Sequence, residues 1–142
     1  MKDIILHTPK TLAFFKKFVK YLPQAVLKKL PAEIAIVPVS EQRSLELNRT
    51  YRKKRNPANV LSFLYGKEYG EIIVCPSVIR REARAKKNSY QYQMTWMIAH
   101  GMIHLAGIHH EDSLRTQARF EKIEAWVLKR ITNYELRMKD NT

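Results

Sequence analysis

The sequence predicts one α+β domain over residues 1–142, with a small mixed β-sheet and helices packed around a central buried helix that carries histidines. Three observations support this fold class. The length is that of one domain and can bury a sizeable core. Short β-branched runs alternate with amphipathic segments, and no repeat or linker interrupts them. Residues 88–110 contain no Asp, Glu, Lys or Arg in a chain that is 27% charged, which indicates a helix buried on most sides.

The first 52 residues are expected to contain two strands and three helices. Thr8 followed by Pro9 fits a helix N-terminus, where the missing amide proton of proline is not needed. The β-branched run 33–39 favours a strand, and Ser40 is a suitable cap for the helix that follows. In order, we expect a strand over 3–7, helices over 9–21 and 24–30, a strand over 33–39 and a helix over 40–52.

The remaining elements are two strands and three helices. A turn bracketed by glycines separates two apolar runs, which should therefore pair antiparallel. Pro76 stands at a first helical position, and Gly107 can end the central helix because glycine adopts the left-handed conformation without steric cost. Asp112 or Ser113 then caps the last helix, whose charges are more balanced and which we interpret as mainly structural. In order, we expect strands over 59–65 and 70–75, and helices over 76–88, 88–107 and from 113 onward.

The charge and cysteine content exclude several classes of protein. Lys and Arg outnumber Asp and Glu by 26 to 13, a formal net charge of +13 that favours a polyanionic partner. The single cysteine, Cys75, rules out an internal disulfide, so we expect a small core residue there and a cytoplasmic protein. No apolar run reaches the roughly 18 residues of a membrane span, and the N-terminus lacks the apolar region of a signal peptide. We therefore expect no membrane partner.

Four of the five histidines fall within the segment HGMIHLAGIHH. His100 and His104 are one helical turn apart and share a face. Gly107 lets the chain reverse, so that His110 can return to the same point. Three neutral imidazoles would form a Zn²⁺ site with one open position, which is the arrangement of catalytic rather than structural zinc. Nickel, cobalt or iron would also suit three imidazoles.

Two other interpretations of this segment compete with a metal-dependent hydrolase. Buried histidines can be core residues with one hydrogen bond each, but several in one uncharged helix would each need a partner. The ligand spacing also repeats that of the long zinc-protease motif, in which a Glu follows the first His as general base. That position is Gly101 here, which disfavours a peptidase.

The same segment closely resembles the signature H-G-x-L-H-L-x-G-Y-D-H of the YbeY family of bacterial metal-dependent endoribonucleases. Upstream, LNRTYRKKRNPANVLSF resembles the family block L-N-x-x-Y-R-x-K-D-x-P-T-D/N-V-L-S-F. GEIIVC, with the basic helix after it, resembles the block G-D-I-x-I-C. The three blocks run in consistent order from about Leu47 to His110, whereas the first 45 residues match only in length and pattern.

The resemblance implies an α+β fold, one zinc ion on His100, His104 and His110, and hydrolysis of single-stranded RNA. It also implies roles in 16S ribosomal RNA 3′-end maturation and ribosome quality control, with ribosomal RNA and the small ribosomal subunit as partners. The family arginine after the tyrosine corresponds to Arg52. That residue becomes the candidate catalytic residue, for contact with phosphate or substrate.

Three positions depart from the family pattern. His109 and Arg55 stand where the family has Asp, and Glu71 stands where it has the Asp of G-D-I. The first departure removes a carboxylate that could orient a ligand imidazole. His109 could compete with His110 for the metal, although the family spacing favours His110. Glu71 is a candidate general base, with a structural role at a strand edge as the alternative.

Two runs of cations are expected to bind RNA. Charged runs are usually solvated, but two of them beside a metal motif for phosphodiester cleavage favour an RNA groove, with Tyr51 placed for base stacking. The candidate RNA-binding residues are Arg49, Arg52, Lys53, Lys54, Arg55, Arg80, Arg81 and Arg84.

The leading functional hypothesis is a zinc-dependent endoribonuclease that acts on ribosomal RNA, through either a metal-activated water or the ribose 2′-OH. One alternative is a non-catalytic, ribosome-associated RNA-binding factor with a structural zinc. Another is a metallohydrolase of a different substrate. The sequence leaves the cleavage site and the oligomeric state open.

Overall fold

The computed structural model describes residues 4–108 and 113–140, with side chains up to residue 132 in the last helix. Its sheet has four strands in the order β1-β2-β4-β3. Strands β1 (Ile5–His7), β2 (Glu33–Pro38) and β4 (Tyr69–Val74) run parallel. Strand β3 (Val60–Leu64) forms the outer edge and pairs antiparallel with β4. The predicted mixed sheet and its antiparallel pair are confirmed.

Six helices accompany the sheet in the described ranges. One of them, α1 (Gln24–Leu27), ends three residues before its predicted end, because residues 28–30 form a turn ahead of Pro31. No helix in these ranges is both long and apolar enough to cross a membrane. The helices are η1 (Lys10–Tyr21), α1 (Gln24–Leu27), α2 (Glu41–Arg52), α3 (Pro76–Lys86), α4 (Tyr90–Leu105) and α5 (Leu114–Asp140).

The first of these helices differs from expectation in its winding. η1 is helical over the predicted residues but is a 3-10 helix. Its buried side chains, Leu12, Phe15 and Phe18, recur every three residues. Three residues make one 3-10 turn, so this winding aligns the three side chains in a single ridge against the core.

The predicted helix boundaries are confirmed at several residues. The Ser40 hydroxyl accepts a backbone N–H from the first turn of α2 at 3.1 Å, and Pro76 is the first residue of α3. Gly107 follows α4 with a φ of +83°, the left-handed conformation that favours glycine. The Ser113 hydroxyl accepts a backbone N–H from the first turn of α5 at 3.2 Å, so Ser113 caps this helix. Asp112, the other predicted cap, lies outside the described residues.

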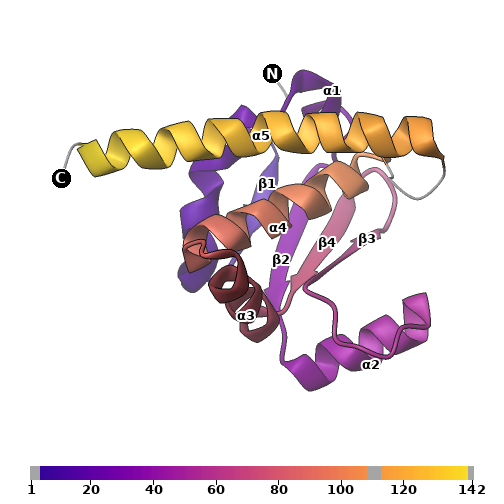
Figure 1. Ribbon diagram of the computed structural model, residues 1–142. Helices are drawn as coiled ribbons and strands as arrows, with labels where there is room; N and C mark the ends of the chain where they lie inside the picture. The colour runs from indigo at the N-terminus through magenta and orange to yellow at the C-terminus, as the bar shows by residue number, and fades with distance from the viewer. Residues whose placement is uncertain (1–3, 109–112, 141–142) are drawn as a thin grey trace.

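Helix α4 lies between the sheet and two further helices (Figure 1). It contacts β3 and β4 on one side, and η1 and α5 on the other. The α4 side chains Met94, Ile98 and Met102 are at most 1% exposed. This double burial explains why the segment carries no charged side chain, and it confirms the predicted central buried helix.

Strands β3 and β4 carry a different helix on each face of the sheet. Alternate residues of a strand point to opposite faces. Ser62 and Ile72 lie against α4 at Gly101, whereas Leu61 packs with Leu47 of α2. The histidine-bearing helix and the basic end of α2 therefore approach the outer edge of β3 from its two sides.

Candidate metal centre and nucleic-acid groove

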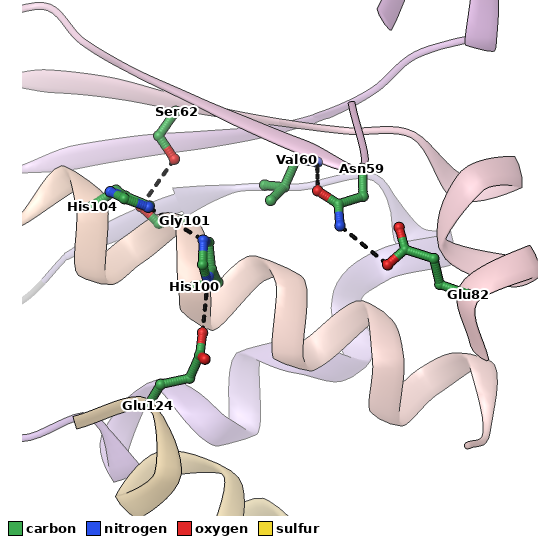
Figure 2. Close-up of polar contacts among 8 residues, drawn as sticks. All are labelled: Asn59, Val60, Ser62, Glu82, His100, Gly101, His104 and Glu124. Atoms are coloured by element: carbon green, nitrogen blue, oxygen red, sulfur yellow. Dashed lines mark hydrogen bonds and ion pairs between the residues drawn. The ribbon is translucent and has the colours of Figure 1, made fainter. Parts of the chain in front are cut away.

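Two of the three predicted metal ligands meet on α4. His100 and His104 are one turn apart, and their Nε2 atoms lie 3.2 Å from each other (Figure 2). Two imidazole ligands of one tetrahedral zinc ion, with Zn–N bonds of about 2.0–2.1 Å, would place their nitrogens about 3.3 Å apart. The pair therefore has the spacing that a shared zinc ion requires.

A carboxylate fixes the orientation of the first imidazole. Glu124 of α5 contacts His100 Nδ1 at 2.6 Å, and the two side chains are only 18% and 24% exposed. Figure 2 shows this contact on the side of the His100 ring away from His104. A proton held at Nδ1 by the carboxylate leaves the Nε2 lone pair for a metal, which is the usual partnership of carboxylate, histidine and zinc.

Phe120, one turn before Glu124 on α5, holds both imidazoles from the side. Its ring centroid is 4.8 Å from that of His100 and 4.8 Å from that of His104. Phe120 is 2% exposed, so its ring restricts the rotation of both histidines. The last helix, interpreted from the sequence as mainly structural, thus supplies two side chains to the candidate centre.

The third predicted ligand, His110, lies outside the described residues, and so does the neighbouring His109. Within residues 4–108 and 113–140, no three His, Cys, Asp or Glu side chains gather closely enough to hold a metal ion. The three-histidine site therefore stays a prediction, and the described part of the chain contributes two of its members.

Gly101 separates this centre from that of the zinc proteases. A Cβ atom there would lie 2.9 Å from Ile72 Cγ2 and 3.0 Å from the Ser62 hydroxyl oxygen. The Ser62 hydroxyl also donates to the Gly101 carbonyl at 3.0 Å (Figure 2). Position 101 thus faces the sheet rather than the ligand atoms, so a glutamate there would have no room to act as the protease base.

The structure argues against Glu71 as the general base. Its neighbours Gly70 and Ile72 face α4, so Glu71 points to the opposite face of the sheet. Its carboxylate accepts a hydrogen bond from Tyr65, which raises the pKa of that phenol above its ordinary value. Burial and the same carboxylate also raise the pKa of Tyr69. Glu71 therefore has a structural role on the sheet, the alternative to its role as general base.

A groove of about 500 Å³ opens beside the two histidines, along the outer edge of β3. Its walls come from the last turn of α2, from the whole of β3 and from the C-terminal half of α4. The groove is lined by Tyr51, Arg52, Asn59, Val60, Leu61, Ser62, Phe63, Leu64, His100, His104, Leu105 and Gly107. Arg52, the candidate catalytic residue, thus shares one hollow with the candidate metal ligands.

The structure separates the two predicted runs of RNA-binding cations. In the first run Arg52 lines the groove, and the other members, which lie within three residues of it in the sequence, are exposed. The second run lies on α3, and none of its members lines the groove. Around Arg52, the exposed cations are Arg49, Lys53, Lys54 and Arg55; on α3 they are Arg80, Arg81 and Arg84.

Two of the α3 arginines have contacts within the protein. Arg81 pairs with Glu41 at the start of α2, and this guanidinium holds the pKa of the Glu41 carboxyl below its ordinary value. The Arg80 guanidinium lies over the Tyr90 ring, 4.5 Å from its centroid. The surroundings of the groove thus favour the α2 run as the RNA-binding cations.

The functional residues that sequence reasoning missed are Glu124 and Phe120. They lie four residues apart on one face of α5, a signal that also fits an ordinary amphipathic helix. Only the packing of α5 against α4 gives that face a role at His100.

Comparisons with known proteins identify the family of this chain. The family described as "Endoribonuclease YbeY" matches residues 2–132. A protein named Endoribonuclease YbeY from Aquifex aeolicus is 32% identical over 70% of this chain and 71% of its own length. One from Acinetobacter baumannii is 31% identical over 84% of this chain and 82% of its own length. One from Thermotoga petrophila is 35% identical over 66% of this chain and 65% of its own length. The solution structure of TM1509 from Thermotoga maritima is 28% identical, with a TM-score of 0.59 over 92% of both chains. The chain therefore belongs to the YbeY family of endoribonucleases, which are hydrolases.

Proposed function

We propose that this protein is a zinc-dependent endoribonuclease that cleaves single-stranded RNA. The observation that carries the proposal is the pair of Nε2 atoms of His100 and His104, 3.2 Å apart at the wall of a groove that also contains Arg52. The setting we propose is 16S ribosomal RNA 3′-end maturation and ribosome quality control in the cytoplasm, with the small ribosomal subunit as partner.

His100, His104 and, from the motif, His110 would hold the ion. A zinc ion bound there would supply Lewis acidity, which lowers the pKa of a water and offsets negative charge on phosphate oxygens. The residues of the chain do the rest. Glu124 keeps the proton of His100 at Nδ1, and Arg52 is placed to position a phosphate through its guanidinium.

The proton acceptor comes from neither Gly101 nor Glu71, for the steric and topological reasons given above. Glu124 is not among the residues that line the groove and already has its carboxylate on His100. Its role is therefore to position His100 rather than to exchange a proton with substrate. A zinc ion held by the histidines would supply the activation of the nucleophile.

The test combines metal analysis with cleavage of a fluorogenic single-stranded RNA. His104→Ala should lose both bound zinc and cleavage. The matched control is His7→Ala, because His7 is an exposed histidine that pairs with Glu33 on the sheet, away from the groove. It should retain both properties. Cleavage by wild-type protein that survives complete removal of metal would refute the proposal.

A further inference from the structure

An exposed aromatic side chain stands at the rim of the groove. Tyr51, in the last turn of α2, is 64% exposed, and its ring meets the Phe63 ring edge-on at 5.1 Å between centroids. Leu64, at the end of β3, is 55% exposed. All three line the groove that holds the two histidines. Because Phe63 packs with the core of the α2 face, it holds the tyrosine ring in place and presents it to solvent.

Two polar side chains of the groove form hydrogen bonds within the protein. The Asn59 amide accepts from the Val60 backbone at 2.7 Å and donates to Glu82 at 3.2 Å (Figure 2). The Ser62 hydroxyl donates to the Gly101 carbonyl. Neither side chain is therefore set to recognise the hydrogen-bonding edge of a particular base, whereas the face of the Tyr51 ring suits any base.

The cations beside the Tyr51 ring suit the phosphate group of a nucleotide. Arg52 follows Tyr51 directly and lines the same groove, and Lys53 and Lys54 are exposed beside it. Cations that follow a phosphate backbone, combined with an aromatic ring for bases, are the usual means of binding single strands without sequence preference.

We propose that Tyr51, supported by Phe63, is a stacking subsite for one nucleobase of a single-stranded RNA, close to the phosphate that lies at the histidine pair. This inference rests on the proposed function, since it takes RNA as the occupant of the groove. It explains how the site selects single strands: a base within a duplex has both faces covered by its neighbours, so the Tyr51 ring can reach only an unstacked base. The subsite also predicts that RNA binding depends little on which base stands at the stacked position.

Fluorescence anisotropy with a short labelled RNA tests the subsite without any need for turnover. Tyr51→Ala should weaken binding of the single strand about 5- to 150-fold, the range for loss of one base–aromatic stack, while Tyr51→Phe should retain wild-type affinity. The matched control is Tyr65→Ala. Tyr65 is 59% exposed but stacks on Tyr69 and is not a groove residue, so this variant should bind like the wild type.

A set of oligonucleotides with one abasic ribonucleotide at successive positions then identifies the stacked base. At one position the abasic RNA should bind wild-type protein as weakly as intact RNA binds Tyr51→Ala, and combining the two changes should add no further loss. Equal affinity of Tyr51→Ala and wild type for intact RNA would overturn the proposal. The proposal would also be overturned if Tyr51→Ala weakened binding of every abasic RNA by the same factor. The Tyr51 ring would then contribute to affinity by some means other than stacking on a base.

The outcomes separate this subsite from the catalytic proposal. If the abasic coupling is found but wild-type protein with zinc cleaves nothing, the subsite stands and the catalytic proposal fails. If zinc-dependent cleavage proceeds with an unchanged KM in Tyr51→Ala, the subsite fails and the catalytic proposal stands. Melting temperatures of the Tyr51 variants provide the folding control, and an exposed ring predicts only small changes in them.

Discussion

At the scale of single residues, the orientation of His100 depends on one carboxylate from another helix. We predict that Glu124→Gln lowers zinc affinity about 10- to 100-fold, because an amide holds the Nδ1 proton less strongly than a charged carboxylate does. Competition with a chromophoric chelator measures the affinity, and urea unfolding checks that the fold is retained. Glu121→Gln is the control, since Glu121 is an exposed acid of the same helix that pairs with Gln117. Equal zinc affinity in the two variants would contradict a positioning role for Glu124.

Gly101 is the residue at which α4 comes closest to the sheet. Gly→Ala inside a helix ordinarily stabilises by up to about 1 kcal/mol. Here we expect the opposite sign, a loss of about 1–3 kcal/mol, because the new methyl group would meet fully buried Ile72 and the Ser62 hydroxyl. Rotating that hydroxyl away would break its bond to the Gly101 carbonyl. Urea unfolding of Gly101→Ala measures the change, and a gain in stability would show that α4 can move off the sheet at little cost.

At the scale of elements, α2 and α3 present similar cationic runs in different surroundings. We predict that Arg52→Ala weakens RNA binding and lowers the slope of log affinity against log salt by about 1, as expected for one lost phosphate contact. Arg81→Ala should do neither, because its guanidinium is paired with Glu41. Affinities at several salt concentrations provide the comparison. Equal losses in the two variants would show that the RNA path extends over α3.

The same scale shows what a sequence can and cannot predict. Ser40, Pro76 and Gly107 marked helix ends correctly because a cap, a proline or a left-handed residue acts within one turn of its own position. The contact between His100 and Glu124 joins residues 24 positions apart. It depends on how α5 lies across α4, and no local pattern encodes that packing.

At the scale of the whole molecule, the pairing of β3 with β4 could be predicted, but the order of the four strands in the sheet could not. A short turn forces β3 and β4 to be neighbours, whereas β2 pairs with β4 only after the chain has passed through α2 and β3. Which face of β4 meets α4 follows from that assembly. Glu71 was therefore a reasonable candidate base from its place in the sequence, and only the assembled sheet turns it away from the histidines.

The extent of the apolar core determines whether the protein should stay folded when the metal is removed. Its main core joins η1, the sheet, α4 and α5 through buried apolar side chains. His100 and His104 stand at the margin of that core, on the groove. We expect a scaffold of this kind to stay folded without the ion, unlike small domains that are unfolded without zinc.

We therefore predict that metal-free protein keeps its far-UV circular dichroism and unfolds in one cooperative transition. Binding to the native state alone should stabilise it by about 2.7 kcal/mol at a free zinc concentration of 100 times Kd, so the melting temperature should rise as zinc is added. RNA cleavage should be absent without metal and return with zinc. A non-catalytic factor with structural zinc would behave differently: its helical signal would collapse on metal removal, and restored zinc would bring back RNA binding without turnover.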